Sequence, residues 1–473
     1  MPVVRLPRQE GFAQRHLSSV KPSLYLRALH ADTGYWRSPV TLPLIRRDVL
    51  QFSNDKSLEL DPLMKYAICL TRRAFALSEA QPMLHLNDLF DYDLNIWKRS
   101  PGLPWRNIGY RTKADVRDDP NCRRSIRWFW HRIKNGEKLG APDCSAFVRS
   151  HIADIGEHKV RAVWGYPMTM TLGEAVFAVP LIEAYQKSRS PIAYGYETAV
   201  GGTRKIVTEF SGSAHYAALD FKAFDKTVPR ELIDVAFDIL GENLNFVNYR
   251  DHGIADARRN AIMFDYIKHY FINTTIRLCN GERYRKRSGI ASGSYFTQLV
   301  GSVVNHILVT WVYLRLTGRP PRHIKVLGDD SITGGSSSFS LDDAADLIKS
   351  IGMELNVSKS AVTRDISRLT FLGYTINDGA PTKPFARWLA ALLYPEFPDR
   401  SWDVVASRAL GLNYACFGQD DKFDHMTRVI VRLKKFDLAL DASMSRMLEM
   451  IGFSAVSTSL PSKLEYLQRL RLL

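Results

Sequence analysis

The stretch Ile324-Lys-Val-Leu-Gly-Asp-Asp-Ser-Ile-Thr333 predicts a strand, a tight turn and a second strand, with Asp329 and Asp330 at the tip of the hairpin. Two adjacent acids repel each other unless cations neutralise them, and the residues on either side are apolar. Gly-Asp and Asp-Asp pairs also occur in ordinary turns. The stretch alone therefore leaves a metal site and a plain turn as alternatives.

A second acidic segment, Asp220-Phe-Lys-Ala-Phe-Asp225, follows residues 215–219, which have the pattern of a buried strand. Taken alone, its acids are as well explained by helix capping and solvation of a surface turn. Nucleotidyl transfer by two Mg²⁺ ions, roughly 3.5 to 4 Å apart, needs carboxylates from separate segments. Asp220 and Asp329 meet that requirement, and Asp330 would tune or share the coordination.

Two further segments carry candidate functional residues. Residues 289–297, Gly-Ile-Ala-Ser-Gly-Ser-Tyr-Phe-Thr, place two glycines around Ser292. This pattern predicts a flexible loop whose backbone can approach a nucleic-acid base pair closely, although Ser292 or Ser294 could instead cap a helix. Lys359 is a candidate proton donor to a leaving pyrophosphate, and its alternative is a solvated surface lysine.

The charge balance indicates a polyanionic partner. The chain has 64 Lys plus Arg against 49 Asp plus Glu, a formal net charge of +15. Because phosphate neutralisation supplies much of the affinity for nucleic acids, we expect a nucleic-acid partner, with simple solubility as the alternative. The 473 residues, 45% of them hydrophobic, exclude a small or disordered domain and predict one multi-lobed unit or two to three subdomains.

Hydrophobic periodicity places helices around the acidic segments. Pro229 opens a helix, and residues 341–351 form an amphipathic helix that ends at Gly352. The region after Pro395 is rich in helix formers and is expected to form a mainly helical domain. Its expected core positions are Val404, Val405, Leu410, Val429, Ile430, Leu433, Leu438, Met447, Met450 and Leu467.

Cysteine usage and hydropathy bear on the compartment. The five cysteines are scattered without a CxxC pair, which predicts reduced thiols rather than a disulfide or zinc framework. Residues 1–25 are too rich in basic residues for a secretory signal and are expected to form a basic surface arm. Residues 296–314 carry no formal charge, but interspersed polar side chains favour a buried helix over a membrane span.

The order of these segments resembles that of the motifs in viral RNA-dependent RNA polymerases. Asp220 and Asp225, then Ser292-Gly293 with Thr297, then Gly328-Asp329-Asp330, then Lys359, match motifs A to D, and Phe371-Leu-Gly-Tyr374 matches motif E. Upstream, Lys159-Val-Arg161-Ala-Val-Trp-Gly165 is similar to motif F and Ser100-Pro-Gly102-Leu-Pro-Trp105 to motif G. Within this family, phrases such as Ser292-Gly-Ser-Tyr-Phe-Thr-Gln298 and Arg408-Ala-Leu-Gly411 resemble most the polymerases of partitiviruses, which have segmented double-stranded RNA.

The resemblance, which runs from about residue 98 to 418, implies an α+β right-hand fold of fingers, palm and thumb. It implies an antiparallel palm sheet flanked by helices, and a helical thumb. Residues 1–97 would be an N-terminal arm and fingers extension, and residues 98–214 the fingers with motifs G and F. Residues 215–376 would be the palm with an inserted fingers segment and motifs A to E, and residues 377–473 the thumb and C-terminal helices.

The resemblance also implies a role for each matching residue. Asp220, Asp329 and Asp330 would hold two Mg²⁺ ions, with Mn²⁺ as a substitute, and Lys359 would be the general acid. Asp225 would sense the ribose 2′-hydroxyl, with Ser292 steadying it and Thr297 positioning the nascent base pair. Lys159 and Arg161 would bind the triphosphate, and the template contacts would come from Ser100, Gly102, Gly289 and Gly293. One departure is Gly301, where many positive-strand viral polymerases have Asn; Asn305, one helical turn on, would take over ribose selection.

The implied function is replication and transcription of a viral double-stranded RNA genome segment. The expected partners are template and product RNA, NTPs and a capsid protein from another segment, with no membrane, inside the virion in the host cytoplasm. A reverse transcriptase is an alternative, but it would typically have an aromatic residue where Asp225 stands and Tyr before its Asp pair. A basic RNA-binding or nucleocapsid protein is another, and it would need no separated acidic segments.

Overall fold

Four antiparallel strands form the sheet that carries the acidic segments, in the order β12 (His323–Leu327), β13 (Asp330–Gly335), β6 (His215–Ala218) and β15 (Ala361–Thr363). The computed structural model describes Leu26 and residues 33–473, so the expected basic arm at residues 1–25 lies outside the described residues. The predicted hairpin is present, with Leu327 paired to Asp330. The expectation of an antiparallel central sheet is confirmed.

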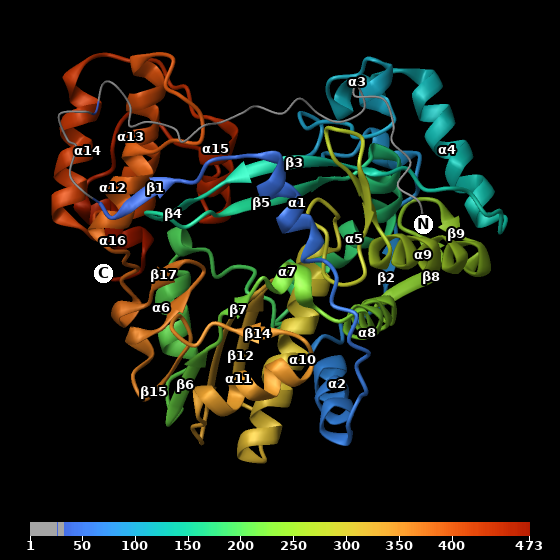
Figure 1. Ribbon diagram of the computed structural model, residues 1–473, viewed down its shortest axis with the longest axis horizontal. Helices are drawn as coiled ribbons and strands as arrows, with labels where there is room; N and C mark the ends of the chain where they lie inside the picture. The colour runs from blue at the N-terminus through green and yellow to red at the C-terminus, as the bar shows by residue number, and fades with distance from the viewer. Residues whose placement is uncertain (1–25, 27–32) are drawn as a thin grey trace.

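Helices cover both faces of this sheet (Figure 1). On one face, α10 (Thr297–Thr317) packs in a core with Val326, together with α8 (Arg230–Gly241) and α11 (Leu341–Ser350). On the other, α6 (Gly202–Glu209) packs in a separate core that contains Ile332. Helix α10 is long and apolar enough to cross a membrane, yet 89% of its most apolar window is buried inside the protein. It therefore serves as a core helix, as the interspersed polar residues indicated.

A second four-stranded sheet lies beyond the end of the first that carries the acidic segments. Its order is β11 (Arg283–Arg285), β10 (Thr275–Arg277), β3 (Cys144–Ser150) and β5 (Val160–Gly165), with β10 parallel to β3. Three helices that pack against one another support it, namely α4 (Pro120–Lys134), α5 (Met168–Lys187) and α9 (Ala257–Ile272).

Shorter elements connect these layers. The strands are β1 (Tyr35–Arg37), β2 (Gln81–Met83), β4 (Ile152–Asp154), β7 (Phe221–Lys222), β8 (Leu244–Tyr249), β9 (Gly253–Ile254), β14 (Glu354–Leu355), β16 (Thr370–Phe371) and β17 (Tyr374–Thr375). The helices are α1 (Leu42–Leu50), α2 (Pro62–Ala74), α3 (Lys113–Asp118) and α7 (Phe224–Thr227). The five cysteines form no disulfide among the described residues.

The C-terminal region forms a helical lobe with its own core, as the sequence predicted. Its helices are α12 (Phe385–Leu393), α13 (Trp402–Cys416), α14 (Asp421–Leu433), α15 (Ala442–Met450) and α16 (Lys463–Arg469). Val405, Leu410 and Ile430 are buried. Four expected core residues are exposed instead, because they lie on the outward side of the lobe: Val429, Leu433, Leu438 and Met450.

Strands β3 and β5 of the second sheet extend toward the helical lobe, together with the strand pair β1 and β4. Figure 1 shows these strands above the first sheet. Arg37 joins the two parts, because its guanidinium donates to the Ser150 carbonyl at 2.9 Å and to the Tyr394 carbonyl at 3.1 Å. Arg149 adds a hydrogen bond to Ser443 Oγ at 3.0 Å. These contacts join the strands β1 and β3 to the helical lobe.

Candidate active site

The register of the central sheet brings the two acidic segments together. β13 pairs with β6 so that Thr333 lies opposite Ala217. Asp220 lies two residues past the end of β6 and Asp330 is the first residue of β13, so this antiparallel pairing brings the two acids to the same end of the sheet. Two segments that are far apart in the sequence thus place their acids at the same end of the central sheet.

The residues just before β15 support Asp220 from the other side. β15 pairs with β6 so that Ala361 lies opposite Ala218, and Lys359 precedes β15 by two residues. The Asp220 N–H donates to Ser360 Oγ at 2.9 Å, and the Asn356 N–H donates to the Asp220 carbonyl at 2.7 Å. These bonds fix the backbone of Asp220 and at the same time place Lys359 beside it.

Helix α10 supports the hairpin turn. The Gly328 N–H donates to Ser302 Oγ at 2.9 Å, and Asn305 Nδ2 donates to the Gly328 carbonyl at 3.0 Å. A Cβ atom added at Gly301 would lie 3.3 Å from Gly328 Cα, so the helix and the turn pack backbone to backbone. Gly328 itself has φ of +64°, a left-handed conformation that suits glycine. The turn that carries Asp329 is therefore held by three neighbouring positions of one helix.

The acids of the site perturb one another. Burial first, and then the charges of Asp329 and Asp220, raise the pKa of Asp330 to about 7. Burial also raises the pKa of Asp329, an effect that Asp220 strengthens and the Arg161 guanidinium opposes. Both residues keep exposed surface, so the effect comes from protein packed around the carboxyl groups and not from full burial. No salt bridge neutralises these three acids within residues 33–473, which fits a site for divalent cations with oxygen ligands.

Asp225 lies beside the same site, in α7. Ala223, in a left-handed conformation with φ of +49°, ends β7 and begins α7. Burial raises the pKa of Asp225, and the charges of Lys226 and Arg161 oppose the rise. Lys226 forms a buried ion pair with Asp48, whose other oxygen accepts the Ala162 N–H at 2.8 Å. The sequence did not single out this pair, which links α1, β5 and α7.

Lys159, the residue before β5, and Arg161, within β5, line a cavity of about 360 Å³. The cavity is also lined by Asp220, Asp225 and Asp329, among other residues. Burial, then the charges of Lys359 and Arg161, lower the pKa of Lys159. Lys159 and Arg161 repel each other, and binding of a polyanion such as a triphosphate would relieve this repulsion. Metal ions held by the nearby carboxylates would allow the polyanion to lie beside the acids.

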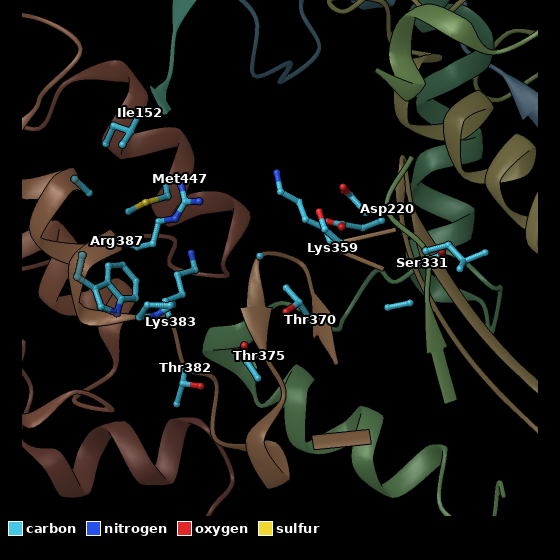
Figure 2. Close-up of a pocket in the computed structure, with 18 of the residues that line it drawn as sticks. Ile152, Asp220, Ser331, Lys359, Thr370, Thr375, Thr382, Lys383, Arg387 and Met447 are labelled. Carbon is cyan, nitrogen blue, oxygen red and sulfur yellow. The ribbon is translucent and has the colours of Figure 1, made fainter. Parts of the chain in front are cut away.

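A second cavity, of about 680 Å³, adjoins the first at Asp220 and Lys359. Figure 2 shows it between the edge of the sheet and the helical lobe, with Lys383 and Arg387 opposite Lys359. The Lys383 ammonium lies 3.9 Å from the ring centroid of Tyr374, and burial lowers its pKa to about 8. The sequence did not single out the cations on this wall. Their signal was weak, because Lys383 and Arg387 are the only two charged residues in the mostly apolar stretch 379–395.

Three predicted nucleotide-binding residues make contacts other than those expected. Ser292 Oγ accepts the Trp164 N–H at 3.1 Å, and among the described residues no hydrogen bond joins it to Asp225. Thr297, the first residue of α10, donates to the Ala291 carbonyl at 2.8 Å. Asn305 is fully buried and bonded to the hairpin turn, so it holds the turn. Its implied role in ribose selection stays a prediction.

The predicted template-contacting glycines approach the protein's own backbone. A Cβ atom would lie 2.5 Å from the Asp225 carbonyl oxygen at Gly289, and 2.3 Å from that of Trp164 at Gly293. At Gly102 it would lie 2.8 Å from the Tyr166 carbonyl oxygen, and all three glycines have positive φ. Close packing therefore explains these glycines without a template. Ser100 accepts the Gly102 N–H at 3.4 Å and stays a predicted template contact.

Comparison with known proteins agrees with this geometry. The family model for viral RNA-dependent RNA polymerases matches residues 34–428. An RNA-directed RNA polymerase of Cryptosporidium parvum virus 1 (strain KSU-1) is 24% identical over 478 residues, which cover 91% of this chain and 85% of that protein. An RNA-directed RNA polymerase of Atkinsonella hypoxylon virus (isolate 2H) is 26% identical over 328 residues, 60% of this chain and 49% of that protein.

The chain belongs to the viral RNA-dependent RNA polymerase family. It is an RNA-directed RNA polymerase, a nucleotidyltransferase that takes an RNA template and NTPs as substrates. Members of this family use divalent metal ions, and the cluster of Asp220, Asp329 and Asp330 provides carboxylates suited to them.

Proposed function

We propose that the protein catalyses two-metal nucleotidyl transfer and thereby replicates and transcribes a segment of a viral double-stranded RNA genome. The convergence of Asp220 with the hairpin acids, without a neutralising salt bridge in the described part of the chain, is the main support. The two ions are proposed to be Mg²⁺, with Mn²⁺ as a substitute. When bound, such ions acidify the attacking 3′-hydroxyl and stabilise the charge of the triphosphate and the leaving pyrophosphate.

The chain's own residues are proposed to act as follows. Asp220 and Asp329 are the primary metal ligands, and Asp330 is an auxiliary one. Lys159 and Arg161 bind the triphosphate from the opposite wall of the 360 Å³ cavity. Asp225, which lines the same cavity, accepts a hydrogen bond from the ribose 2′-hydroxyl.

Lys359 is proposed to be the general acid that protonates the leaving pyrophosphate. Its support is geometric, because it lines both cavities together with Asp220. Proton transfer to the departing oxygen requires a donor at that point of the site. Lys383 and Arg387 line the 680 Å³ cavity and are suited to contact RNA phosphates there.

We further assign the central sheet to the palm, the second sheet and its helices to the fingers, and the helical lobe to the thumb. The contacts of Arg37 and Arg149 with the helical lobe support this assignment, since fingers that touch the thumb suit an enclosed template channel. The enzyme is proposed to act inside a virion in the host cytoplasm, together with a capsid protein from another segment, in a virus similar to the partitiviruses. The similarity to two dsRNA-virus polymerases supports this last step.

The direct test is primer-free incubation of the purified protein with single-stranded RNA, labelled NTPs and Mg²⁺ or Mn²⁺. With a single-stranded template, the proposal predicts a labelled duplex product of template length. With a duplex template, it predicts displacement of new single strands. RNA binding without any incorporation, over a range of templates and with either ion, would contradict the proposed catalysis. Incorporation on single strands but none on duplex RNA would contradict the proposed transcription step alone.

A further inference from the structure

Two buried charged side chains contact the two ends of the loop formed by residues 289–295. The carboxylate of Glu174, in α5, accepts the Ser294 hydroxyl at 2.8 Å and the Tyr295 N–H at 2.9 Å. At the other end, the ammonium of Lys286 donates to the Gly289 carbonyl. Glu174 is 0% exposed and Lys286 is 3% exposed.

Neither of these two charges has an oppositely charged partner among the residues that the structure describes. Burial raises the pKa of Glu174 to about 8 and lowers that of Lys286 to about 7. An unpaired buried ionisable group costs folding free energy, and an apolar side chain of similar volume is often more favourable. Folding stability alone therefore does not explain why charged residues stand at the buried positions of Glu174 and Lys286. Their shared contact with the loop does explain it.

The loop between them is bonded directly to Asp225. The Ile290 N–H donates to the Asp225 carbonyl at 2.7 Å, and the Gly289 N–H donates to the Val228 carbonyl at 2.8 Å. Ser292 Oγ accepts the Trp164 N–H of β5 at 3.1 Å. A shift of the loop must therefore move Asp225 relative to the basic wall, or break these bonds.

We propose that Glu174 and Lys286 are positioning residues that fix the 289–295 loop against Asp225 and so set the selectivity for ribonucleotides over 2′-deoxyribonucleotides. The inference rests on the proposed role of Asp225 in sensing the 2′-hydroxyl. Glu174 and Lys286 themselves lie too deep to contact a nucleotide. Their effect passes through the loop backbone and the hydrogen bond between Ile290 and Asp225.

The test compares Glu174→Leu with Glu174→Gln in single-nucleotide incorporation, measuring kcat and KM for an NTP and for the matching 2′-dNTP. We expect Glu174→Leu to lower the ratio of the two kcat/KM values about tenfold, because small displacements at a reacting centre have large effects on rate. Glu174→Gln should restore the ratio, because its amide oxygen can accept the Tyr295 N–H and its NH₂ can donate to Ser294 Oγ. Thermal unfolding of Glu174→Leu should occur at an equal or higher temperature.

Glu183→Gln and Glu183→Leu are matched controls, because Glu183 lies on the same helix but contacts Tyr92 and Arg250 instead of the loop. Both should leave the selectivity ratio unchanged. Lys286→Met, which removes the contact at the other end of the loop, should lower the ratio in the same direction as Glu174→Leu. It keeps the inference testable if Glu174→Leu fails to fold.

An unchanged ratio in folded Glu174→Leu and Lys286→Met proteins would overturn the inference, even if overall activity falls. The proposed role of Asp225 is checked separately with Asp225→Ala. If Asp225→Ala also shows the selectivity ratio of the unmodified protein, the proposed role of Asp225 in sensing the 2′-hydroxyl is contradicted. If Asp225→Ala lowers the selectivity ratio but Glu174→Leu and Lys286→Met leave it unchanged, only the positioning role of Glu174 and Lys286 is contradicted.

Discussion

The Asp220 segment and the Gly-Asp-Asp hairpin deliver acids to the same site, but different elements support them. Asp220 is bonded to the residues before β15, which also carry Lys359. The hairpin turn is bonded to α10 through Ser302 and Asn305 and packs against Gly301. One side of the site therefore couples a metal ligand to a candidate proton donor, while the other depends on close backbone packing.

The largest expected effect comes from removing charge on the hairpin side. Asp329→Asn keeps the size of the side chain and removes a proposed metal ligand, so NTP incorporation should fall at least about a thousandfold. RNA affinity, measured by fluorescence anisotropy at fixed salt, should stay within about twofold, because phosphate contacts do not depend on this acid. Incorporation within tenfold of the unmodified enzyme would contradict the assignment of Asp329.

On the Asp220 side, Lys359→Leu should lower kcat about a hundredfold, a typical loss for a general acid. The KM for NTP should change little if the side chain acts mainly in the transition state. Lys349→Leu is the control, because Lys349 is an exposed lysine at the end of α11 that lines neither cavity. A large rise in KM with unchanged kcat would instead show that Lys359 binds the triphosphate.

The packing on the hairpin side is tested by Gly301→Ala. Its Cβ atom would lie 3.3 Å from Gly328 Cα, so the turn must shift by a few tenths of an ångström. We expect kcat to fall about tenfold. The unfolding temperature should change little, because alanine favours a helix interior by about 1 kcal/mol over glycine. Gly140→Ala, where an added Cβ meets no atom within 4 Å, should leave kcat unchanged.

The smallest expected effect is the pH dependence of the metal-free protein. The folded-state pKa of Asp330, about 7, lies above that of an unfolded aspartate, so its protonated form is favoured by folding. This contribution to stability is fully present below the unfolded pKa and is lost as the pH rises through about 7. The unfolding temperature of the unmodified protein should therefore fall by on the order of 1 °C between pH 5 and 7.5, measured by calorimetry in EDTA. This fall should be absent in Asp330→Asn. An identical pH profile for the two proteins would contradict this account of Asp330.

The acids of the site could be predicted from the sequence because each lies in a short local motif. The strand pattern of residues 215–219 and the hairpin around Gly328 are local too, and both are present. The supports could not be predicted in this way. Which residues of α10 meet the turn depends on how the helix crosses the sheet, so the bond of the buried Asn305 to the turn could not be predicted.

Glu174 and Lys286 show the same limit of local motifs. They contact the 289–295 loop from elements that only the tertiary fold brings to it. One signal was available, because Glu174 is the only charged residue in the otherwise apolar and small-residue stretch 168–182. A lone acid in a buried helix is expensive and therefore indicates a specific contact. The outward-facing residues of the helical lobe, such as Leu433, had no comparable signal, since the pattern of apolar residues there did not reveal which face is covered.

The claim that the acids of two separate segments form one metal site is tested most directly by counting bound Mn²⁺. Electron paramagnetic resonance titration would compare the unmodified protein with Asp220→Asn and Asp329→Asn, each bound to an RNA primer–template and a non-hydrolysable NTP analogue. The account predicts two ions per unmodified protein and a loss of at least one ion, or a marked fall in affinity, in either variant. Two ions bound with unchanged affinity in both variants would contradict it.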